Sequence, residues 1–288
     1  MHTDLTPRHR TIATNGIHLH AVEAGPEGGP LLILLHGFPE FWYGWRRQIE
    51  PLAAAGFRVL APDQRGYNLS DKPKKASAYG VDLLARDVLG LIDDSGATKA
   101  RIVGHDWGGL VAWWLGLRYP ERIERLALLN IPHPRVILDA LRKSPAQRKK
   151  SWYVFFFQLP WLPERAFRAD GFALGVRSLQ RSSRPGTFSD ADLDLYREAW
   201  SRPGAVRSMI HWYRAGVRSR PKLPASLRVR VPTLLLWGAQ DRFLGREMAQ
   251  PSIDLCDDGQ LVFFEEASHW LQHEEPERVN RELVGFFG

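Results

Sequence analysis

The sequence predicts an α/β fold, with a mostly parallel sheet flanked by helices and interrupted by a helical insertion. Short, continuous apolar segments end in turn residues, which is typical of strands buried on both faces. Segments with helical periodicity alternate with them, as in successive strand–helix–strand units. From about residue 132 to residue 228 the alternation stops, and helical spacing with many aromatic residues replaces it.

The N-terminal part supplies the first strands of this sheet. Residues 11–25 (TIATNGIHLHAVEAG) alternate apolar and polar positions around Asn15 and Gly16, a pair that predicts a tight hairpin turn. Two antiparallel strands are therefore expected at the start. Residues 31–39 (LLILLHGFP) and 57–63 (FRVLAPD) are predicted to contain buried parallel strands.

The next stretch repeats the order helix, strand, helix, strand. Residues 79–96 place apolar side chains three and four positions apart, which indicates an amphipathic helix that ends near the glycine at 96. A strand is expected at 100–106, a helix at 110–120 that stops at its terminal proline, and a further buried strand at 123–130.

Sheet-forming patterns return after the insertion. Strands are predicted within residues 231–241 and 260–269, and the chain ends in a segment, 276–287, whose apolar residues share one helical face. We therefore divide the chain into a first core part, a helical cap and a second core part, at residues 1–131, 132–228 and 229–288.

Composition narrows the classes of function. The chain has 288 residues, of which 44% are hydrophobic and 25% charged, as in ordinary globular proteins. The longest apolar stretch, residues 152–162, is shorter than the ~20 residues of a membrane span. The N-terminus lacks the apolar core of a signal peptide, and Cys256 is the only cysteine, so a cytoplasmic location is expected and Cys256 is expected to be an inert thiol.

The chain is basic, with a formal net charge of +7 and an isoelectric point near 9.7. Arginines occur along its whole length, with one local cluster at residues 141–150. No recognition fold for nucleic acid accompanies this cluster, so we interpret it as the solvated face of a helix.

The motif GHDWGG at residues 104–109 has the form of a strained strand-to-helix turn that presents a nucleophile. An aspartate, Asp106, stands at its centre, and Asp241 and His269 follow in the order nucleophile, acid, base. The alternative roles are a helix N-cap for Asp106 and a turn residue for Asp241. A rival acid position after the strand at 123–130 carries Asn130, which cannot balance an imidazolium charge.

Three segments resemble the α/β-hydrolase superfamily, and within it the aspartate-nucleophile branch of epoxide hydrolases and haloalkane dehalogenases. Residues 36–39 (HGFP) resemble the family's oxyanion loop, residues 63–73 (DQRGYNLSDKP) resemble the segment after the next strand, and residues 104–109 resemble the nucleophile motif. The likeness covers nearly the whole chain and implies the α/β-hydrolase fold. It also implies an oxyanion hole formed by the backbone N–H groups of Phe38 and Trp107.

A carboxylate at the nucleophile position has a definite chemical use. It can attack an sp³ carbon, displace oxygen or halide, and form an ester. Water can then cleave this ester at the carbonyl of Asp106, with His269 as general base and Asp241 orienting it. His36 and His105 are expected to be structural neighbours of this site.

The leaving group must be inferred from the cap. In the epoxide hydrolases that the chain resembles, two cap tyrosines donate hydrogen bonds to the epoxide oxygen, and a phenol with a pKa of ~10 stays protonated at neutral pH. Tyr153 and Tyr213 match those positions. The alternative is that both belong to the cap core. Trp152, Phe155, Phe156 and Trp161 are expected mainly to pack within the cap, some of them lining the substrate pocket.

Two other functions remain open. A haloalkane dehalogenase would hold the halide with the indole after the nucleophile, which Trp107 fits, but Phe38 stands where many dehalogenases have Asn. A haloacid dehalogenase of the fluoroacetate type would be expected to carry arginines near the nucleophile, where this chain has Trp107 and Leu110. A non-catalytic binder of a small apolar ligand is the third candidate.

The sequence thus predicts an epoxide hydrolase that converts lipophilic epoxides into vicinal diols. Asp106, Asp241, His269, Tyr153 and Tyr213 are the predicted catalytic residues. Phe38, Trp107 and the two tyrosines are expected to contact the substrate. No metal or organic cofactor is expected, because the histidines lack ligand-like spacing. Neither a nucleic-acid partner nor a membrane span is expected, and the oligomeric state, a homodimer included, is left open.

Overall fold

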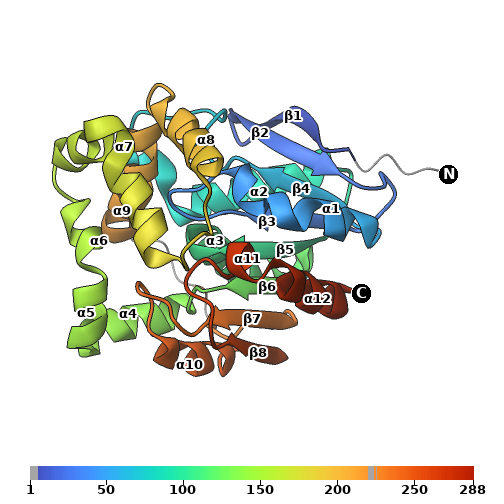
Figure 1. Cartoon of the computed structure of the whole chain (residues 1–288). Coiled ribbons are helices and arrows are strands. Elements are labelled where there is room, and N and C mark those ends of the chain that lie inside the picture. Colours follow the sequence, from blue (N-terminus) through green and yellow to red (C-terminus); the bar gives the residue numbers. More distant parts are fainter. Residues whose placement is uncertain (1–5, 220–223, 225) are drawn as a thin grey trace.

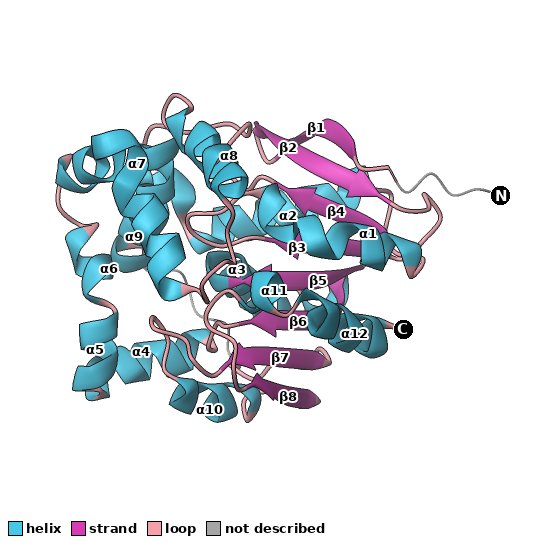
Figure 2. Cartoon of the chain, viewed as in Figure 1, coloured by secondary structure: helices cyan, strands magenta, loops and turns pink. Residues whose placement is uncertain are grey.

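In the computed structural model, which describes residues 6–219, 224 and 226–288, eight strands form a single sheet (Figures 1 and 2). Their order across the sheet is β1-β2-β4-β3-β5-β6-β7-β8. The strands are β1 (Arg8–Thr14), β2 (Ile17–Ala24), β3 (Leu31–Leu35), β4 (Arg58–Pro62), β5 (Ala100–His105), β6 (Ile123–Leu129), β7 (Thr233–Gly238) and β8 (Gly259–Phe264).

The sheet is antiparallel only at its N-terminal edge. β1 pairs with β2, and β2 with β4, in antiparallel register, whereas every pair from β4 to β8 is parallel. Asn15 and Gly16 join β1 to β2 with φ angles of 45° and 76°. Two consecutive positive φ angles match the twist of a hairpin. The predicted hairpin and the mostly parallel sheet are both confirmed.

Helices cover both faces of the sheet, which explains why the central strands are apolar throughout. In β3, Leu31, Ile33 and Leu35 belong to one buried cluster, whereas Leu32 and Leu34 belong to another. Successive side chains of a strand point to opposite faces, so each face needs its own apolar cover. One cluster includes α2 (Val81–Asp94), α3 (Asp106–Arg118) and α10 (Ala249–Ile253), and the other includes α1 (Arg46–Ala54) and α12 (Pro276–Phe287).

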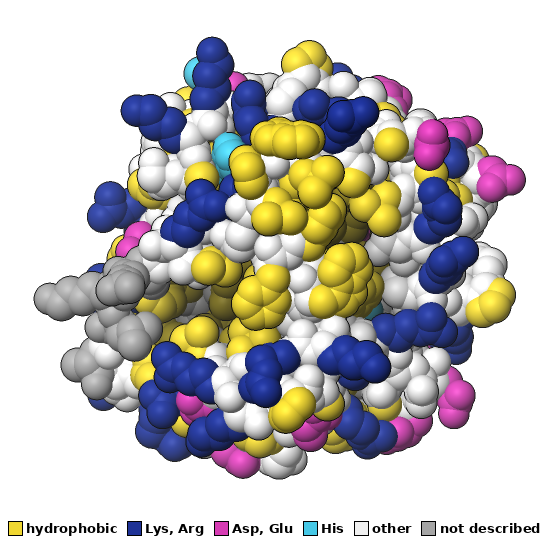
Figure 3. Space-filling model, turned by 90° about the vertical axis from the view of Figure 1, so that its left-hand side faces the viewer, with side chains coloured by type: hydrophobic (Ala, Val, Ile, Leu, Met, Phe, Trp, Pro, Cys, Tyr) yellow, Lys and Arg dark blue, Asp and Glu magenta, His cyan; other side chains and the backbone are white. Residues whose placement is uncertain are grey.

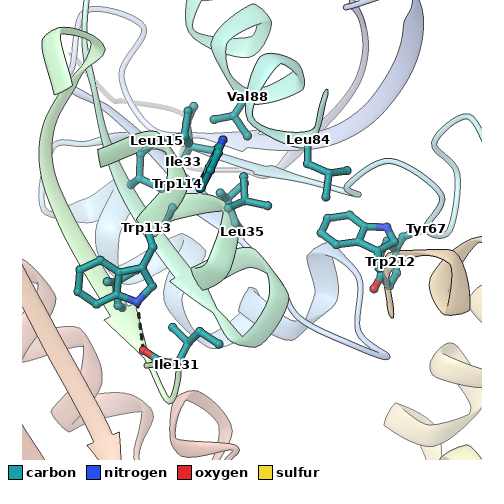
Figure 4. Close-up of a cluster of buried hydrophobic side chains, with 14 of the residues drawn as sticks. Ile33, Leu35, Tyr67, Leu84, Val88, Trp113, Trp114, Leu115, Ile131 and Trp212 are labelled. Atoms are coloured by element: carbon teal, nitrogen blue, oxygen red, sulfur yellow. Dashed lines mark hydrogen bonds between the residues drawn. The ribbon is translucent and has the colours of Figure 1, made fainter. Parts of the chain in front are cut away.

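The cluster around α3 extends without a break from the sheet to the inserted helices (Figure 4). Trp113 is fully buried and donates a hydrogen bond to the carbonyl of Ile131, 3.2 Å away, just after β6. Trp212, on an inserted helix, contacts the ring of Tyr67 and donates to the carbonyl of Arg65 at 2.9 Å. The insertion therefore packs on the core as part of one hydrophobic cluster.

Between β6 and β7 the chain forms the helical insertion that the sequence predicts. Residues 220–223 and 225, near the end of the predicted cap, lie outside the described residues, and the division at 131/132 and 228/229 stays a prediction. None of the described helices is long and apolar enough to cross a membrane. The inserted helices are α4 (Pro134–Lys143), α5 (Pro145–Lys150), α6 (Trp152–Phe156), α7 (Leu162–Ser182), α8 (Asp190–Ser201) and α9 (Ala205–Arg218).

Several details differ from the sequence-based expectations. Helix α3 begins at Asp106, in keeping with a strand-to-helix turn at this residue, and so includes the motif glycines that precede the predicted helical segment 110–120. Helix α1 was not predicted, since it is short and contains Pro51. Three aromatic residues expected mainly inside the cap are largely exposed: Trp152 at 62%, Phe155 at 60% and Trp161 at 66%.

Gly108 gives a test of how closely α3 approaches the sheet. A Cβ atom at this position would lie 2.2 Å from the carbonyl oxygen of Leu35, in the neighbouring strand β3. We expect Gly108→Ala to lower the free energy of unfolding by about 1–3 kcal/mol, because backbone cannot move aside without disturbing the sheet. Denaturant unfolding followed by circular dichroism measures this change.

The matched control is Gly285→Ala in α12, where a Cβ atom would have no neighbour within 4 Å. It should raise the free energy of unfolding by about 0.5–1 kcal/mol, because alanine is the better helix former. Equal effects of the two substitutions would contradict the close approach of α3.

Candidate active site

Asp106 occupies the sharp turn from β5 to α3, with a φ of 50°. A positive φ is strained for a residue other than glycine and persists where the surroundings determine it. Here the surroundings are other backbone segments. A Cβ atom on Gly37 would lie 2.4 Å from the Asp106 Cβ, and one on Gly104 would lie 2.6 Å from the carbonyl oxygen of Gly108. The glycines let three segments meet around the Asp106 carboxylate.

His269 and Asp241 come to Asp106 from the loops after β8 and β7. The Nδ1 atom of His269 lies 2.6 Å from Asp241 Oδ2, and its Nε2 atom lies 3.8 Å from Asp106 Oδ2. Carboxyl ends of parallel strands meet at one edge of a sheet, so residues far apart in sequence converge there. The structure therefore brings the three predicted triad residues together, with Asp241 behind His269.

The buried carboxylate of Asp241 accepts hydrogen bonds from several donors besides His269. Asn130 Nδ2 donates to its Oδ2 at 2.7 Å, and the backbone N–H groups of Phe243 and Leu244 donate to its Oδ1 at 2.7 and 3.0 Å. Burial by itself would raise the pKa of Asp241, but His269 and these donors hold that pKa below its usual value. The carboxylate is thus kept ionised beside the imidazole.

The environment of His269 favours its protonated form. Burial would lower the pKa of this imidazole, but the charge and hydrogen bond of Asp241, together with the charge of Asp106, raise it above its usual value. An imidazole of this kind can accept a proton from water, and its cation is then stabilised by the buried acid.

One backbone donor already points at the nucleophile position. The N–H of Phe38 donates to Asp106 Oδ1 at 2.8 Å, and the Phe38–Pro39 peptide bond is cis. The N–H of Trp107 belongs to the first turn of α3, where amides have no partner within the helix. The N–H of Phe38 thus contacts the Asp106 carboxylate, whereas the N–H of Trp107, the next residue after Asp106, stays a predicted donor.

A cavity of about 130 Å³ opens above this carboxylate, between the core and the cap. Asp106, His269 and Phe38 line it from the core, and Tyr153 of α6 and Tyr213 of α9 line it from the cap. Its other walls are apolar or aromatic, apart from one serine. They are Pro39, Trp152, Phe156, Phe157, Phe167, Leu174, Ser178, Phe243 and Trp270.

Tyr153 and Tyr213 face each other across the cap side of the cavity, with ring centroids 5.8 Å apart. Burial, and then the nearby charge of Asp106, raise the pKa of both phenols above the ordinary value. Both phenols therefore remain protonated at neutral pH and can donate hydrogen bonds. The indole of Trp107, in contrast, packs on Trp212 and Tyr213 and is not among the residues that line the cavity; its contact with substrate stays a prediction.

Comparison with known proteins identifies the family to which this arrangement belongs. Residues 30–276 match the model of the alpha/beta hydrolase fold. The chain belongs to the α/β-hydrolase fold family. Its predicted fold class is confirmed, including the eight-stranded, mostly parallel sheet and the helical insert between β6 and β7 within the described residues.

Several relatives of this α/β-hydrolase-fold chain are epoxide hydrolases. It is 46% identical to the AB hydrolase superfamily protein YfhM of Bacillus subtilis, over 96% of both chains. It is 40% identical to human epoxide hydrolase 4, over 96% of this chain and 77% of the other. The solved structure of an epoxide hydrolase variant from Bacillus megaterium has a TM-score of 0.88 and 31% identity, over 96% of this chain and 99% of that one. A further structure of an epoxide hydrolase from this organism, with TM-score 0.87, contains its product, a naphthyloxy-propanediol.

The α/β-hydrolase site includes a buried acid that the sequence analysis did not identify. Glu40 Oε2 lies 3.2 Å from His105 Nδ1, and the Nε2 of the same His105 lies 2.9 Å from the backbone oxygen of His269. Burial would raise the pKa of Glu40, but His273 and His105 hold that pKa well below its usual value. Glu40 directly follows the HGFP segment, and this position is the signal that could have revealed it.

His36 and His105 are neighbours of the site, as expected. His36 Nε2 accepts the backbone N–H of Gln64 at 3.1 Å, which ties the oxyanion loop to the end of β4. Asn130, considered above only as a rival acid position, is instead a donor to Asp241. Among the described residues, no group of three or more His, Cys, Asp and Glu side chains is arranged to hold a metal ion.

The contact between Asp241 and His269 leads to a prediction about pH. Asp241→Asn removes the negative charge beside Nδ1, so the pKa of His269 should fall relative to that of the wild type. A raised pKa in the folded state means that this ionisation stabilises the fold below the unfolded pKa of about 6.5, and that the stabilisation is lost as the pH rises through the folded pKa. Nuclear magnetic resonance titration of the His269 ring, assigned with His269→Gln, measures the shift.

The control is Asp257→Asn, which removes an exposed carboxylate paired with Arg228 at the surface. This substitution should leave the pKa of His269 unchanged. An unaltered His269 titration in Asp241→Asn would show that the buried acid does not set the charge of the imidazole.

Proposed function

We propose that this protein is an epoxide hydrolase that opens lipophilic epoxides to vicinal diols through a covalent ester on Asp106. The observation that carries the proposal is the arrangement of a carboxylate and two buried phenols on opposite sides of one apolar cavity. A nucleophile on one side and proton donors on the other suit a strained ring whose carbon is attacked while its oxygen gains negative charge.

In the first step, Asp106 Oδ2 attacks one ring carbon and the bond from that carbon to the ring oxygen breaks. Asp106 Oδ1 accepts the hydrogen bond of Phe38, so Oδ2, on the side of His269, is the oxygen suited to attack. Tyr153 and Tyr213 donate hydrogen bonds to the departing oxygen, and one of them supplies its proton. The product is a hydroxyalkyl ester of Asp106.

In the second step, water cleaves the ester at the carbonyl carbon of Asp106. The 3.8 Å between His269 Nε2 and Asp106 Oδ2 lets one water contact both groups, and His269 removes its proton. Asp241 stabilises the imidazolium, and the N–H groups of Phe38 and Trp107 stabilise the oxyanion. Loss of one such donor typically raises the barrier by roughly 2.7–4 kcal/mol. The bond from the Asp106 carbonyl carbon to the diol oxygen then breaks, and this oxygen takes the remaining proton of the attacking water. The diol leaves, Asp106 retains one oxygen from water, and the proton on His269 passes through solvent to the tyrosine that gave up its own.

Two features favour an epoxide over a halide as the substrate. A halide leaving group needs no proton, whereas the alkoxide formed from an epoxide does, and the cavity contains two phenols that stay protonated. The relatives named above include epoxide hydrolases, and the likeness to them spans 96% of this chain.

Product analysis with epichlorohydrin tests the proposal, because this molecule carries an epoxide and a chloride on three carbons. We expect the chlorinated diol to accumulate without early release of chloride, as measured by gas chromatography and a chloride electrode. Early chloride together with glycidol would support a dehalogenase. Failure to open both epichlorohydrin and the bulkier styrene oxide would favour a non-catalytic binder.

The same assay on tyrosine variants tests the assigned roles. Tyr213→Phe removes one donor to the ring oxygen, and we expect the rate of epoxide opening to fall by roughly 10²-fold. Tyr43→Phe is the matched control, because the Tyr43 hydroxyl donates to Asp192 at 3.0 Å and does not line the cavity. Equal rates for the two variants would remove Tyr213 from the mechanism.

A further inference from the structure

The outer surface of the cap carries a cluster of exposed apolar side chains, which we call the aromatic face. Figure 3 shows apolar side chains gathered around a hollow on this side of the molecule, with Lys and Arg side chains around them. Monomeric proteins rarely expose contiguous apolar patches of this kind without a function. The aromatic face consists of Trp152, Phe155, Leu159, Trp161, Leu162 and Leu174, each at least 40% exposed.

Trp161 is exposed to solvent although its backbone is in a strained conformation. Its φ is 49°, a left-handed conformation that is unfavourable for a bulky side chain, yet 66% of the residue is exposed. Burial of the indole in the cap therefore does not compensate this strain. Strained residues cluster at functional positions, and tryptophan is the residue type enriched where apolar and aqueous phases meet.

The charge of the chain is concentrated in the same part of the sequence. Residues 132–228 contain 19 Lys and Arg but 7 Asp and Glu, a net charge of +12, whereas the rest of the chain has 20 against 25, a net charge of −5. Arginines do occur throughout, but their excess over acids lies in the predicted cap. Helix α5, directly before the aromatic face, contributes three consecutive basic residues, 148–150.

Two arginines next to Trp161 are free of acidic partners among the described residues. Arg165 and Arg168 are both exposed, and no described ion pair involves either of them. Together with Arg207 they line an open surface cleft beside Trp161. The one acid of this cleft, Glu164, is buried and bound by Arg214 at 2.5 Å. The cleft thus offers unpaired guanidinium groups suited to phosphate.

The cavity above Asp106 opens within the aromatic face. Trp152, Leu174 and Ser178 line this cavity and are themselves exposed, so they form its entrance. A protein bound over the aromatic face would block the entrance. A lipid surface would instead present apolar molecules directly to it.

We propose that the aromatic face and the basic residues around it bind the surface of an anionic lipid bilayer. Trp161, Phe155 and Trp152 enter the interface, and Arg165 and Arg168 contact lipid phosphates. Interfacial binding of this type scales with buried apolar area and with attraction between basic residues and anionic lipids. The binding itself does not depend on the proposed function. The direct entry of bilayer-dissolved epoxides into the cavity does rest on it.

Flotation of the full-length protein with lipid vesicles tests the binding without any need for turnover. We expect the protein to float with phosphatidylcholine vesicles that contain about one third phosphatidylglycerol, and to remain in solution with phosphatidylcholine alone. Raising the salt to about 1 M should release it, because the Debye length falls from about 10 Å at 0.1 M to about 3 Å. Inorganic phosphate at millimolar concentration should not release it.

Two double variants, each with a matched control, locate the binding surface. Phe155→Ser with Trp161→Ser removes the exposed rings, and Arg165→Ser with Arg168→Ser removes two charges; each pair should weaken partitioning by about tenfold or more. The controls are Leu69→Ser and Arg86→Ser with Lys99→Ser, all exposed positions outside the cap, which should bind as the wild type does. None of these residues lines the catalytic cavity.

The outcomes that would overturn the proposal are specific. They are equal binding to neutral and anionic vesicles, no binding to either, or unchanged binding of both cap variants. Each variant is also tested for thermal unfolding and for hydrolysis of a water-soluble epoxide. A variant with a folding defect changes in these two assays, whereas a variant with a binding defect alone does not. If the protein binds the vesicles but hydrolyses no epoxide, the proposed function is wrong and the proposed binding to an anionic bilayer is still supported.

Discussion

The strained turn at Asp106 is the constraint on which the rest of the structure depends. Its positive φ aims the carboxylate away from both β5 and α3, into the space between core and cap. Neighbouring segments pack closely around that turn, since a Cβ atom on Gly108, Gly37 or Gly104 would lie 2.2, 2.4 or 2.6 Å from its nearest neighbour. Strand β5, which ends at this turn, lies between β3 and β6 in the sheet. The segments that follow these two strands, residues 36–39 and Asn130, therefore lie at the same edge of the sheet as the turn. The chemistry of the site is therefore a consequence of how closely the backbone can pack.

The cap must be fixed relative to this turn, because both phenols come from it. Arg214, the residue after Tyr213, is buried and donates to the carbonyls of Phe157 and Leu159 as well as to Glu164. Removing one member of such a buried pair typically costs about 3–5 kcal/mol, a large part of the roughly 5–15 kcal/mol by which a folded protein is stable. Trp212, the residue before Tyr213, is anchored to the core at Arg65. Tyr213 is thus held from both sides, one contact within the cap and one to the core.

Sequence patterns predicted the fold, because its elements depend on short-range rules. They predicted the grouping of Asp106, Asp241 and His269 because the carboxyl ends of parallel strands meet at one edge of a sheet. Hairpin turns, buried strands and a glycine-flanked turn each have a local signature. Side-chain partners that depend on tertiary packing could not be predicted, as Glu40 and the new role of Asn130 illustrate. Exposure was also misjudged for Phe155 and Trp161, since an aromatic cluster in sequence does not reveal whether a second layer covers it.

The most direct test of the account is mass spectrometry of the variant His269→Gln after brief exposure to an epoxide. Without the general base, ring opening can proceed but ester cleavage is slowed, so an adduct with the mass of the substrate should accumulate. We expect this added mass on the peptide that contains Asp106, and we expect it to disappear when Asp106→Asn is added. A diol formed with no adduct, or an adduct on another residue, would contradict the assignment of Asp106 as nucleophile.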